Sequence, residues 1–524
     1  MWKLSDREQL PGLLAQDWDI VVVGGGITGA GILLEASRRG LHALLVEQRD
    51  FAWGTSSRSS KLVHGGLRYL KEGKFKLTRD SVRERENLMR EAPGLVDAQP
   101  FAFANYAKRK PGRWAFSLGL AIYDRMAERA EKHWYRREEF LMLAPAVGRA
   151  GLQGGLCYTD AKTDDARLVL RVLQEAVAAG GHALNYLAAQ ELDRHEGKVG
   201  GLVLRDDVAG ARYRVRAKVV INATGAWADG LRQASGKHKL RPLRGSHLIL
   251  PAWKLPLAQA ISFMHPRDGR PVFAFPWEGA TLVGTTDVDH REDLRQEAII
   301  TADEARYLME ALAFQFPQIG FDAADVISSY AGVRPVIDTG KSDPSKEGRD
   351  HAVWMEDGLL TVTGGKLTTF RLIALDALKQ AAARLPGWQD KLELRPVFRV
   401  FALPRSQNLT ATQHARLAGR LGINAPSMIA QARPEELQTI DGTETLWAEL
   451  RWAARHEAVH HLEDLLLRRT RLGLLLAQGG AAILPRVREL CQIELAWNDA
   501  RWEQEEADYR ALWQRHYAPP EAAT

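Results

Sequence analysis

A short stretch near the start of the chain concentrates side chains that could bind a ligand and move a proton. Residues Gly54 to Tyr69 read GTSSRSSKLVHGGLRY and combine five Ser or Thr hydroxyls with His64 and Arg68. Imidazole has an unperturbed pKa close to neutrality, and a guanidinium binds an anion through paired hydrogen bonds. The stretch predicts a loop where a ring system and a substrate meet, and a solvated polar loop is the alternative.

A glycine-rich turn precedes this loop. Gly24-Gly-Gly-Ile-Thr-Gly29 follows a β-branched run at 19–23 and leads into an apolar helical pattern, and a second buried run at 43–46 ends at Glu47. In such a βαβ unit the glycines allow a tight turn, the approach of a pyrophosphate and close helix packing, while Glu47 accepts from ribose hydroxyls. The context predicts a dinucleotide site, and a glycine-rich turn without a ligand is the alternative.

Later segments supply the elements that must hold these residues. Residues 217–225 and 358–364 read as further buried strands of the nucleotide domain, the second one feeding a helix from Leu367. Strand patterns occur at 247–250, 272–275 and 281–285, separated by proline and glycine. They predict an antiparallel sheet in the part of the chain between the strands 217–225 and 358–364.

Helical patterns fill much of the remainder. Residues 75–145 are charged and helical in pattern, and helical periodicity dominates after Pro386, for example from Val487 to Ala500. We therefore expect a discontinuous nucleotide domain and a separate helical domain at the C-terminal end.

Composition excludes several classes of protein. The 524 residues are 45% hydrophobic and 26% charged, which argues against a disordered chain or a collagen-like fibre. Two distant cysteines support neither a disulfide framework nor a zinc site, so no metal is expected. A net charge of +6 is too small for a nucleic-acid binder. No apolar run is long enough to span a bilayer, and we expect a cytoplasmic chain.

One basic segment points to a membrane surface. Lys108, Arg109, Lys110 and Arg113 run directly into an apolar stretch that contains Trp114, Phe116, Leu118, Leu120, Ile122 and Tyr123. Basic residues beside aromatic and aliphatic ones suit the headgroup layer of an anionic membrane. A solvated turn before a core helix is the alternative.

Several motifs together resemble one family. They are GGGITGAG, GTSSRSSKLVHGGLRYL, Thr163–Leu168, Asn222–Gly225, Arg244–His247, Gly284–Asp287, Gly332–Pro335, Gly364–Thr369 and Arg468–Thr470. This set is similar to the FAD-dependent glycerol-3-phosphate dehydrogenases, within the D-amino-acid-oxidase-like flavoproteins. The resemblance covers nearly the whole chain.

The resemblance implies a fold and an activity. The fold is α/β, with a Rossmann-like FAD-binding domain and an antiparallel substrate cap in residues 1–385, the cap mainly at 75–150 and 235–330, and a C-terminal α-helical domain in 386–524. The activity is oxidation of sn-glycerol 3-phosphate to dihydroxyacetone phosphate, with FAD as cofactor and a quinone as electron acceptor. A homodimer held on the inner face of the cytoplasmic membrane is implied as well.

The chemistry requires three kinds of residue. Hydride transfer to a flavin needs a base for the hydroxyl proton and positive charge near the reduced ring, and a phosphomonoester needs guanidinium groups. His64 and His247 are the candidate bases and Lys366 supplies charge ahead of a helix, so these three are the predicted catalytic residues. The substrate residues implied are Arg68, Tyr69, Arg334 and Lys366. Lys366 could instead be a surface lysine, and Arg68 or Arg334 could form a structural ion pair. His247 could be a buried strand histidine, and His64 could contact the flavin through its backbone.

The cofactor residues implied are Gly24, Gly26, Ile27, Thr28, Gly29, Glu47, Gln48, Thr55, Ser56, Ser59, Lys61, Leu62, His64, Thr224, Gly225, Gly365, Lys366, Leu367 and Thr368. Three other functions stay open. Close relatives are oxidases that use oxygen, a flavin oxidase of amino or 2-hydroxy acids needs cations for a carboxylate only, and a flavin-carrying membrane adaptor shows no turnover.

Overall fold

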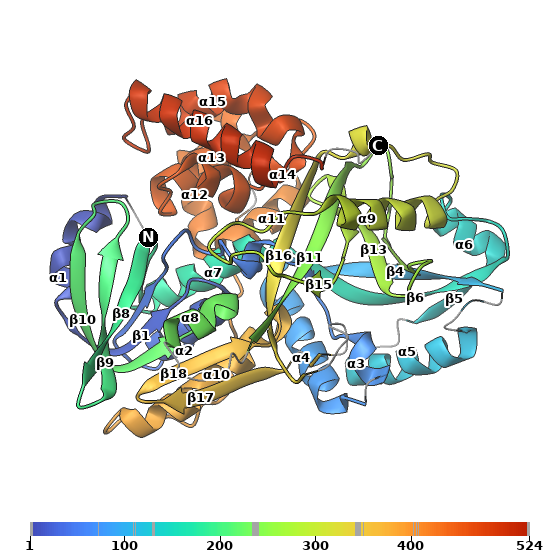
Figure 1. Ribbon diagram of the computed structural model, residues 1–524. Coiled ribbons are helices and arrows are strands. Elements are labelled where there is room, and N and C mark those ends of the chain that lie inside the picture. The colour runs from blue at the N-terminus through green and yellow to red at the C-terminus, as the bar shows by residue number, and fades with distance from the viewer. Residues whose placement is uncertain are drawn as a thin grey trace.

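The computed structural model describes residues 4–71, 73–107, 109, 112–127, 132–232, 240–340, 347–348, 350–401, 403–404, 406 and 408–520. Figure 1 shows two sheets beneath a helical C-terminal region. A short 3-10 helix (Leu4–Gln9) and α1 (Leu10–Leu14) lead into the first sheet.

The first sheet is mostly parallel and holds the glycine-rich turn. Its order is β17-β18-β10-β1-β2-β7, and the hairpin of β8 and β9 extends from β10. The strands are β1 (Asp17–Val23), β2 (Ala43–Val46), β7 (His182–Leu184), β8 (Leu187–His195), β9 (Lys198–Asp206), β10 (Arg212–Asn222), β17 (His351–Glu356) and β18 (Leu359–Gly364). Because β18, β10, β1 and β2 pair in parallel, the predicted strands of the nucleotide domain are confirmed.

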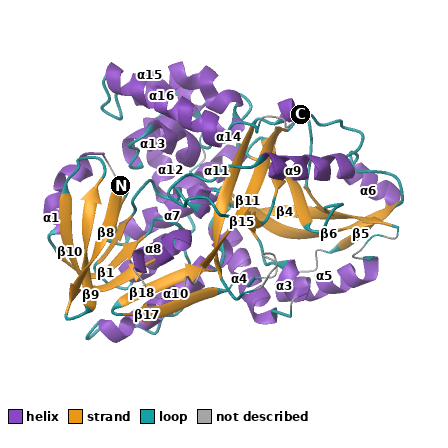
Figure 2. Cartoon of the chain, viewed as in Figure 1, coloured by secondary structure: helices purple, strands orange, loops and turns teal. Residues whose placement is uncertain are grey.

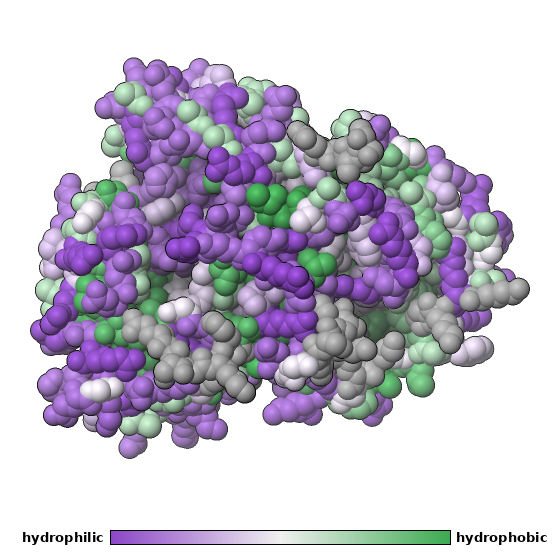
Figure 3. All heavy atoms as spheres, in the orientation of Figure 1, coloured by the Kyte–Doolittle hydropathy of each residue, from purple (hydrophilic) through white to green (hydrophobic). Residues whose placement is uncertain are grey.

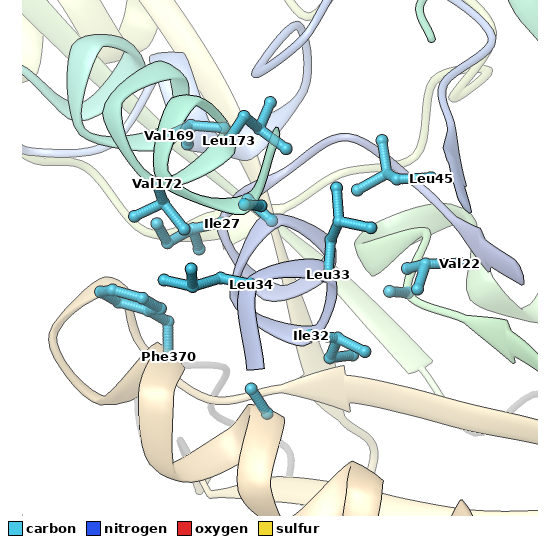
Figure 4. Close-up of a cluster of buried hydrophobic side chains, with 14 of the residues drawn as sticks. Val22, Ile27, Ile32, Leu33, Leu34, Leu45, Val169, Val172, Leu173 and Phe370 are labelled. Carbon is cyan, nitrogen blue, oxygen red and sulfur yellow. The ribbon is translucent and has the colours of Figure 1, made fainter. Parts of the chain in front are cut away.

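Three helices pack against one another beside this sheet. They are α2 (Ile27–Ser37), α7 (Asp165–Ala178) and α10 (Phe370–Ala381). Figure 4 shows Leu33 and Leu34 of α2 among side chains of the neighbouring helices, including Phe370. A Cβ on Gly31 would lie 2.9 Å from Cδ2 of Phe370, so this glycine allows α2 and α10 to approach closely. Helix α8 (Ala228–Arg232) follows β10.

The second sheet is largely antiparallel, which confirms the prediction for residues 247–285. It contains β3 (Leu62–Val63), β4 (Val96–Tyr106), β5 (His133–Arg136), β6 (Leu152–Thr163), β11 (Leu240–Pro251), β12 (Ala260–Met264), β13 (Pro271–Trp277), β14 (Ala280–Gly284), β15 (Val288–Asp289) and β16 (Ser328–Ile337). Only β12 and β4 pair in parallel within the described strands of this sheet. The ranges 75–150 and 235–330 are predicted to form most of the substrate cap. Strands β3 and β6 and the end of β16 belong to this sheet but lie outside those ranges.

The helices around this sheet are α3 (Leu67–Lys71), α4 (Phe75–Glu91), α5 (Arg113–Ala127), α6 (Arg137–Leu143) and α9 (Ala302–Gln315). The prediction that 75–145 is helical is partly wrong, because the eleven-residue strand β4 crosses it. Phe101 and Phe103 in β4 are buried, and the strand pairs with β6 on one side and β12 on the other. Long-range pairing, which a local pattern does not contain, decides this segment.

The C-terminal region is helical, as predicted, and Figure 2 shows it without strands. Its helices are α11 (Ala411–Leu421), α12 (Ala425–Gln431), α13 (Trp447–His456), a π-helix (Asp464–Arg469), α14 (Leu472–Leu475), α15 (Leu484–Cys491) and α16 (Asp499–His516). The helical periodicity from Val487 to Ala500 falls on two helices, because α15 ends at Cys491 and α16 begins at Asp499. Ala496 has φ +55°, Ile493 is 86% exposed, and Asn498 caps the start of α16. No helix among the described residues is long and apolar enough to cross a membrane.

Candidate active site

The turn after β1 has a shape that requires glycine. Gly24 adopts φ +117° and its N–H donates to the carbonyl of Val46 at 2.8 Å. A Cβ on Gly29 would lie 1.9 Å from the carbonyl oxygen of Gly24. The first and third glycines of the motif therefore fix the turn and the packing of α2, as the pattern predicts.

The N-terminus of α2 faces the loop 54–66, which we call the hydroxyl-rich loop. The N–H of Ile27 donates to Oγ of Ser56 at 3.0 Å, and a Cβ on Gly26 would lie 3.1 Å from that oxygen. The first turn of α2, which includes Thr28, carries no acidic side chain. A helix N-terminus with this environment fits a pyrophosphate, so the residues present fit a dinucleotide cofactor.

Glu47 follows β2 and lies beside the same turn. Its Oε2 accepts from the N–H of Gly25 at 2.7 Å and its Oε1 from the N–H of Arg49 at 2.8 Å. Burial raises the pKa of Glu47 against the effect of these two bonds. The carboxylate thus supports the turn, and each oxygen retains acceptor capacity for a ribose hydroxyl. Gln48 is exposed.

The loop between Gly54 and Gly66 joins the two sheets. Oγ1 of Thr55 donates to the carbonyl of Val333 in β16, and the Tyr330 hydroxyl donates to the carbonyl of Ser59 at 2.9 Å. Oγ of Ser60 lies 2.9 Å from Nε2 of His247 in β11. These hydroxyls bond to other segments of the protein, so the alternative of a solvated loop is wrong.

His247 is fully buried. Its ring stacks on Tyr330 with centroids 4.7 Å apart and planes 13° apart. Burial, reinforced by Arg334 and Lys61, lowers the pKa of His247 well below its usual value. The ring is therefore neutral at physiological pH, and its hydrogen bond to Ser60 connects it to the loop.

The segments that carry His64 and Lys366 contact each other, although they are far apart in the sequence. Oγ1 of Thr368 donates to the carbonyl of His64 at 3.2 Å. Nζ of Lys366 lies 3.6 Å from the ring centroid of Tyr69 and donates to Oγ of Ser81 at 3.0 Å. Gly365 has φ +79°, which allows the turn from β18 into the short 3-10 helix Leu367–Thr369. The half-buried residue His64 thus belongs to a segment, ending at Gly66, that lies beside a cation held against an aromatic face, since a Cβ on Gly66 would lie 3.3 Å from Nζ of Lys366.

Arg334 has a fixed orientation. Its Nη1 lies 2.9 Å from Oδ1 of Asp287, and its Nη2 donates to Oγ1 of Thr285 at 3.1 Å. The structural ion pair considered as an alternative is present, but Asp287 is shared with Arg270 at 3.1 Å. Asp287 thus lies between two cations, and the Arg334 side chain is 18% exposed. The side chain of Arg68 lies outside the described part of the chain, so its substrate role stays a prediction.

The remaining predicted cofactor residues lie in supporting positions. Oγ1 of Thr224 donates to Asn222 at 2.7 Å, and the carbonyl of Gly225 accepts from Thr363 at 3.1 Å. Leu62 is buried in β3. The ammonium of Lys61 is fully buried and lies 3.0 Å from Asp165. These positions leave their cofactor contacts as predictions, with the Lys61 side chain already bonded within the protein.

Sequence reasoning missed several residues that hold the loop. Asp160 and the Tyr123 hydroxyl both accept from the N–H of Gly65, at 3.1 Å and 2.8 Å, and Arg85 pairs with Asp160 at 2.6 Å. Asp165 bonds to the loop directly. Arg85 and Asp160 stand in segments that contain several other charged residues, so the sequence does not distinguish them and only the fold shows their partners. Within the ranges described, no cluster of metal-ligating side chains occurs.

The sequence matches known proteins over most of its length. The model of the FAD dependent oxidoreductase family matches residues 19–371, more than half of the chain. The chain belongs to this family. The model for the C-terminal domain of alpha-glycerophosphate oxidase matches residues 381–502 of this family member. FAD is therefore the cofactor of this chain.

Relatives narrow the group within the family. The aerobic glycerol-3-phosphate dehydrogenase of Staphylococcus saprophyticus is 35% identical over 495 residues, 88% of each chain. That of Staphylococcus epidermidis is 40% identical over 377 residues, 70% of this chain and 68% of the relative. The solved glycerol-3-phosphate dehydrogenase from Bacillus halodurans, complexed with FAD, is 27% identical, with a TM-score of 0.75 over 98% of this chain and 97% of that one. The chain is thus a member of the glycerol-3-phosphate dehydrogenase and oxidase group.

Proposed function

We propose that this flavoenzyme oxidises sn-glycerol 3-phosphate to dihydroxyacetone phosphate and passes the electrons to a quinone. One observation carries the proposal: strand β16, which holds Arg334, contacts β18, which leads into Lys366, and the hydroxyl-rich loop bonds to Val333 and Thr368 in these two segments. A phosphate ester needs cations of this kind beside the cofactor.

Each residue has a role in this proposal. The carbinol carbon gives up a hydride and its hydroxyl gives up a proton, so two electrons leave the substrate. FAD, when bound, supplies the hydride acceptor. Arg334, oriented by Asp287 and Thr285, binds the phosphate, with Arg68 as its predicted second cation. Lys366 supplies positive charge beside the cofactor.

We assign the hydroxyl proton to a ring nitrogen of His64. The residue His64 is half-buried, whereas His247 is fully buried with cations near it. An imidazolium at position 247 would carry an unpaired charge in the interior, which is costly. His247 then acts through Ser60 as a positioning residue.

Helix α5 supports attachment to an anionic membrane surface. Trp114, Leu118 and Ile122 recur at every fourth position and are 79%, 66% and 36% exposed, while Leu120 and Tyr123 face inward. Figure 3 shows hydrophobic atoms at the lower right, where Figure 1 draws α5. The exposed row combines with Arg113 and Arg125 in the same helix; Lys108 and Lys110 lie outside the described residues. The homodimer stays a prediction.

A dye-reduction assay tests the substrate, and reoxidation tests the acceptor. We expect turnover with sn-glycerol 3-phosphate and little with glycerol, 2-hydroxy acids or amino acids. Reduced enzyme should return to the oxidised form faster with a soluble quinone than with oxygen. Rapid formation of hydrogen peroxide would instead assign the protein as an oxidase, and an enzyme-bound flavin that no substrate reduces would indicate an adaptor.

A further inference from the structure

Asp165, at the start of α7, bonds to two residues of the hydroxyl-rich loop. Its Oδ2 accepts from the N–H of Ser59 at 2.9 Å and from the Ser59 hydroxyl at 2.7 Å, and its Oδ1 accepts from Nζ of Lys61 at 3.0 Å. The side chain is fully buried. One carboxylate therefore fixes both a backbone group and a side chain in the segment Ser57–Lys61.

Arg471 reaches the same place from the C-terminal helical region. It donates to Asp165, to Oδ1 of Asp164 at 3.0 Å, and to the carbonyl of Ser57 at 3.0 Å. The Ser57 carbonyl also accepts from Lys61 at 3.0 Å. Nη1 of Arg471 also donates to the carbonyl of Leu467 at 2.7 Å, so hydrogen bonds fix the direction of the guanidinium. A residue far along the chain thus closes the network around the loop.

The buried charges of this network depend on one another. Asp164 and Asp165 face Lys61, Arg471 and Arg420, and all five side chains are buried. Burial, with Arg471 beside it, lowers the pKa of Lys61 to about 8. A buried charge that loses its partner is strongly unfavourable, so neutralising Asp165 leaves two cations facing each other.

The loop that this network holds contacts the residues of the site. Ser56 bonds to the N–H of Ile27 at the start of α2, Ser60 bonds to His247, and Thr55 bonds to β16. A displacement of Ser57–Lys61 would move the hydroxyl of Ser60, which lies within the segment, and those of Thr55 and Ser56, which precede it. The positions of these hydroxyls therefore depend on Asp165 and on Arg471.

We infer that Asp165 and Arg471 are positioning residues for the cofactor loop, and that the C-terminal helical region contributes to FAD binding through them. The inference rests on the proposed contact between FAD and the hydroxyl-rich loop. Coupling between two sites is reciprocal, so FAD bound to the loop must also strengthen the docking of the Arg471 segment.

Two measurements on the full chain, stripped of FAD and reconstituted, test the inference. Asp165→Asn keeps the side-chain shape and removes the charge, and we expect it to weaken FAD binding by about ten-fold or more. Glu457→Gln is the matched control, because the Glu457 carboxylate pairs with Arg167 of α7 at 2.6 Å and accepts from Gln174 of that helix, and neither residue belongs to the loop. FAD affinity close to wild type is expected for this control.

Deuterium exchange supplies the second measurement. Adding FAD should slow exchange in Leu467–Leu475 of the wild type and have little effect there in Asp165→Asn. If Asp165→Asn does not fold, Arg471→Lys, which keeps the charge and loses the forked contact, should show the weaker FAD binding.

Wild-type FAD affinity in the variant that folds, or an equal loss in Glu457→Gln, would overturn the inference. Neither measurement uses a substrate. A protein that binds FAD normally but does not oxidise glycerol 3-phosphate would therefore refute the proposed function and leave the role of Asp165 and Arg471 intact.

Discussion

Nε2 of His247 lies 2.9 Å from Oγ of Ser60, while Nδ1 of the same ring is buried without a hydrogen-bond partner among the described residues. A buried N–H without an acceptor is rarer than an acceptor without a donor. The proton of the neutral ring is therefore placed on Nε2, which donates to Ser60. The Ser60 hydroxyl is then available to donate to a bound ligand.

Because His247 is buried and neutral, replacing it should have a different effect from replacing His64. His64→Asn should lower kcat by roughly 10²- to 10⁴-fold, the usual contribution of a general base, and remove the acidic limb of the pH profile. His247→Asn should lower kcat less and keep that limb, because the buried ring stays neutral across it. The profile of kcat against pH measures both. An acidic limb that disappears in His247→Asn and persists in His64→Asn would reverse the assignment.

Arg334 should contribute mainly to substrate affinity. Arg334→Ala removes a guanidinium held by Asp287 and Thr285, and we expect a loss of ~2 to 5 kcal/mol in binding the phosphate. The Michaelis constant rises while the flavin content, read from absorbance, stays at the wild-type value. Arg334→Lys keeps the charge without the paired contacts and should fall between the two. An unchanged Michaelis constant in Arg334→Ala would remove Arg334 from the site.

Lys61 gives the folded chain a specific dependence on pH. Its pKa is about 8 in the folded state, against 10.5 for an ordinary lysine. Between these values the unfolded chain holds a proton that the folded chain has released, so the free energy of unfolding rises with pH, by up to about 3 kcal/mol from this group. Below pH 8 both states are protonated and the contribution of Lys61 is constant.

Urea denaturation of wild type and Lys61→Met, carried out at pH 8 and at pH 10.5, measures this effect. The rise in unfolding free energy should be larger in the wild type than in the variant. Equal pH dependence in the two proteins would show that Lys61 titrates normally, contrary to its burial beside Arg471.

Helix α5 gives a prediction for membrane binding. Leu118→Glu places a charge in the exposed apolar row. It should weaken binding to anionic vesicles by about ten-fold or more, as expected when one leucine side chain no longer inserts into the membrane. Ile493→Glu is the control, because Ile493 is 86% exposed in the C-terminal region, away from α5. Co-sedimentation with vesicles measures both. Equal binding of Leu118→Glu and wild type would assign α5 an ordinary solvated face.

The sequence predicts those parts of the site that depend on local patterns. Gly24, Gly29 and the strands around them follow from a spacing that only one βαβ geometry satisfies. The candidate residues of the loop could likewise be recognised, because hydroxyls, His64 and glycines occur together in one segment.

The remaining features depend on contacts between distant residues. Strand β4 has a helical neighbourhood and becomes a strand through its pairing with β6 and β12. The burial of His247 follows from its stacking on Tyr330, eighty-three positions later, and Arg471 meets Asp165 across 306 positions. No periodicity in a single sequence contains these pairings.

Anaerobic mixing of the FAD-loaded protein with sn-glycerol 3-phosphate tests the proposed oxidation without an electron acceptor. We expect the visible absorbance of the oxidised flavin to disappear with one substrate molecule per flavin, and Arg334→Ala to need a far higher concentration for the same loss. Equal loss of absorbance with a 2-hydroxy acid that lacks a phosphate, or no loss with glycerol 3-phosphate, would contradict it.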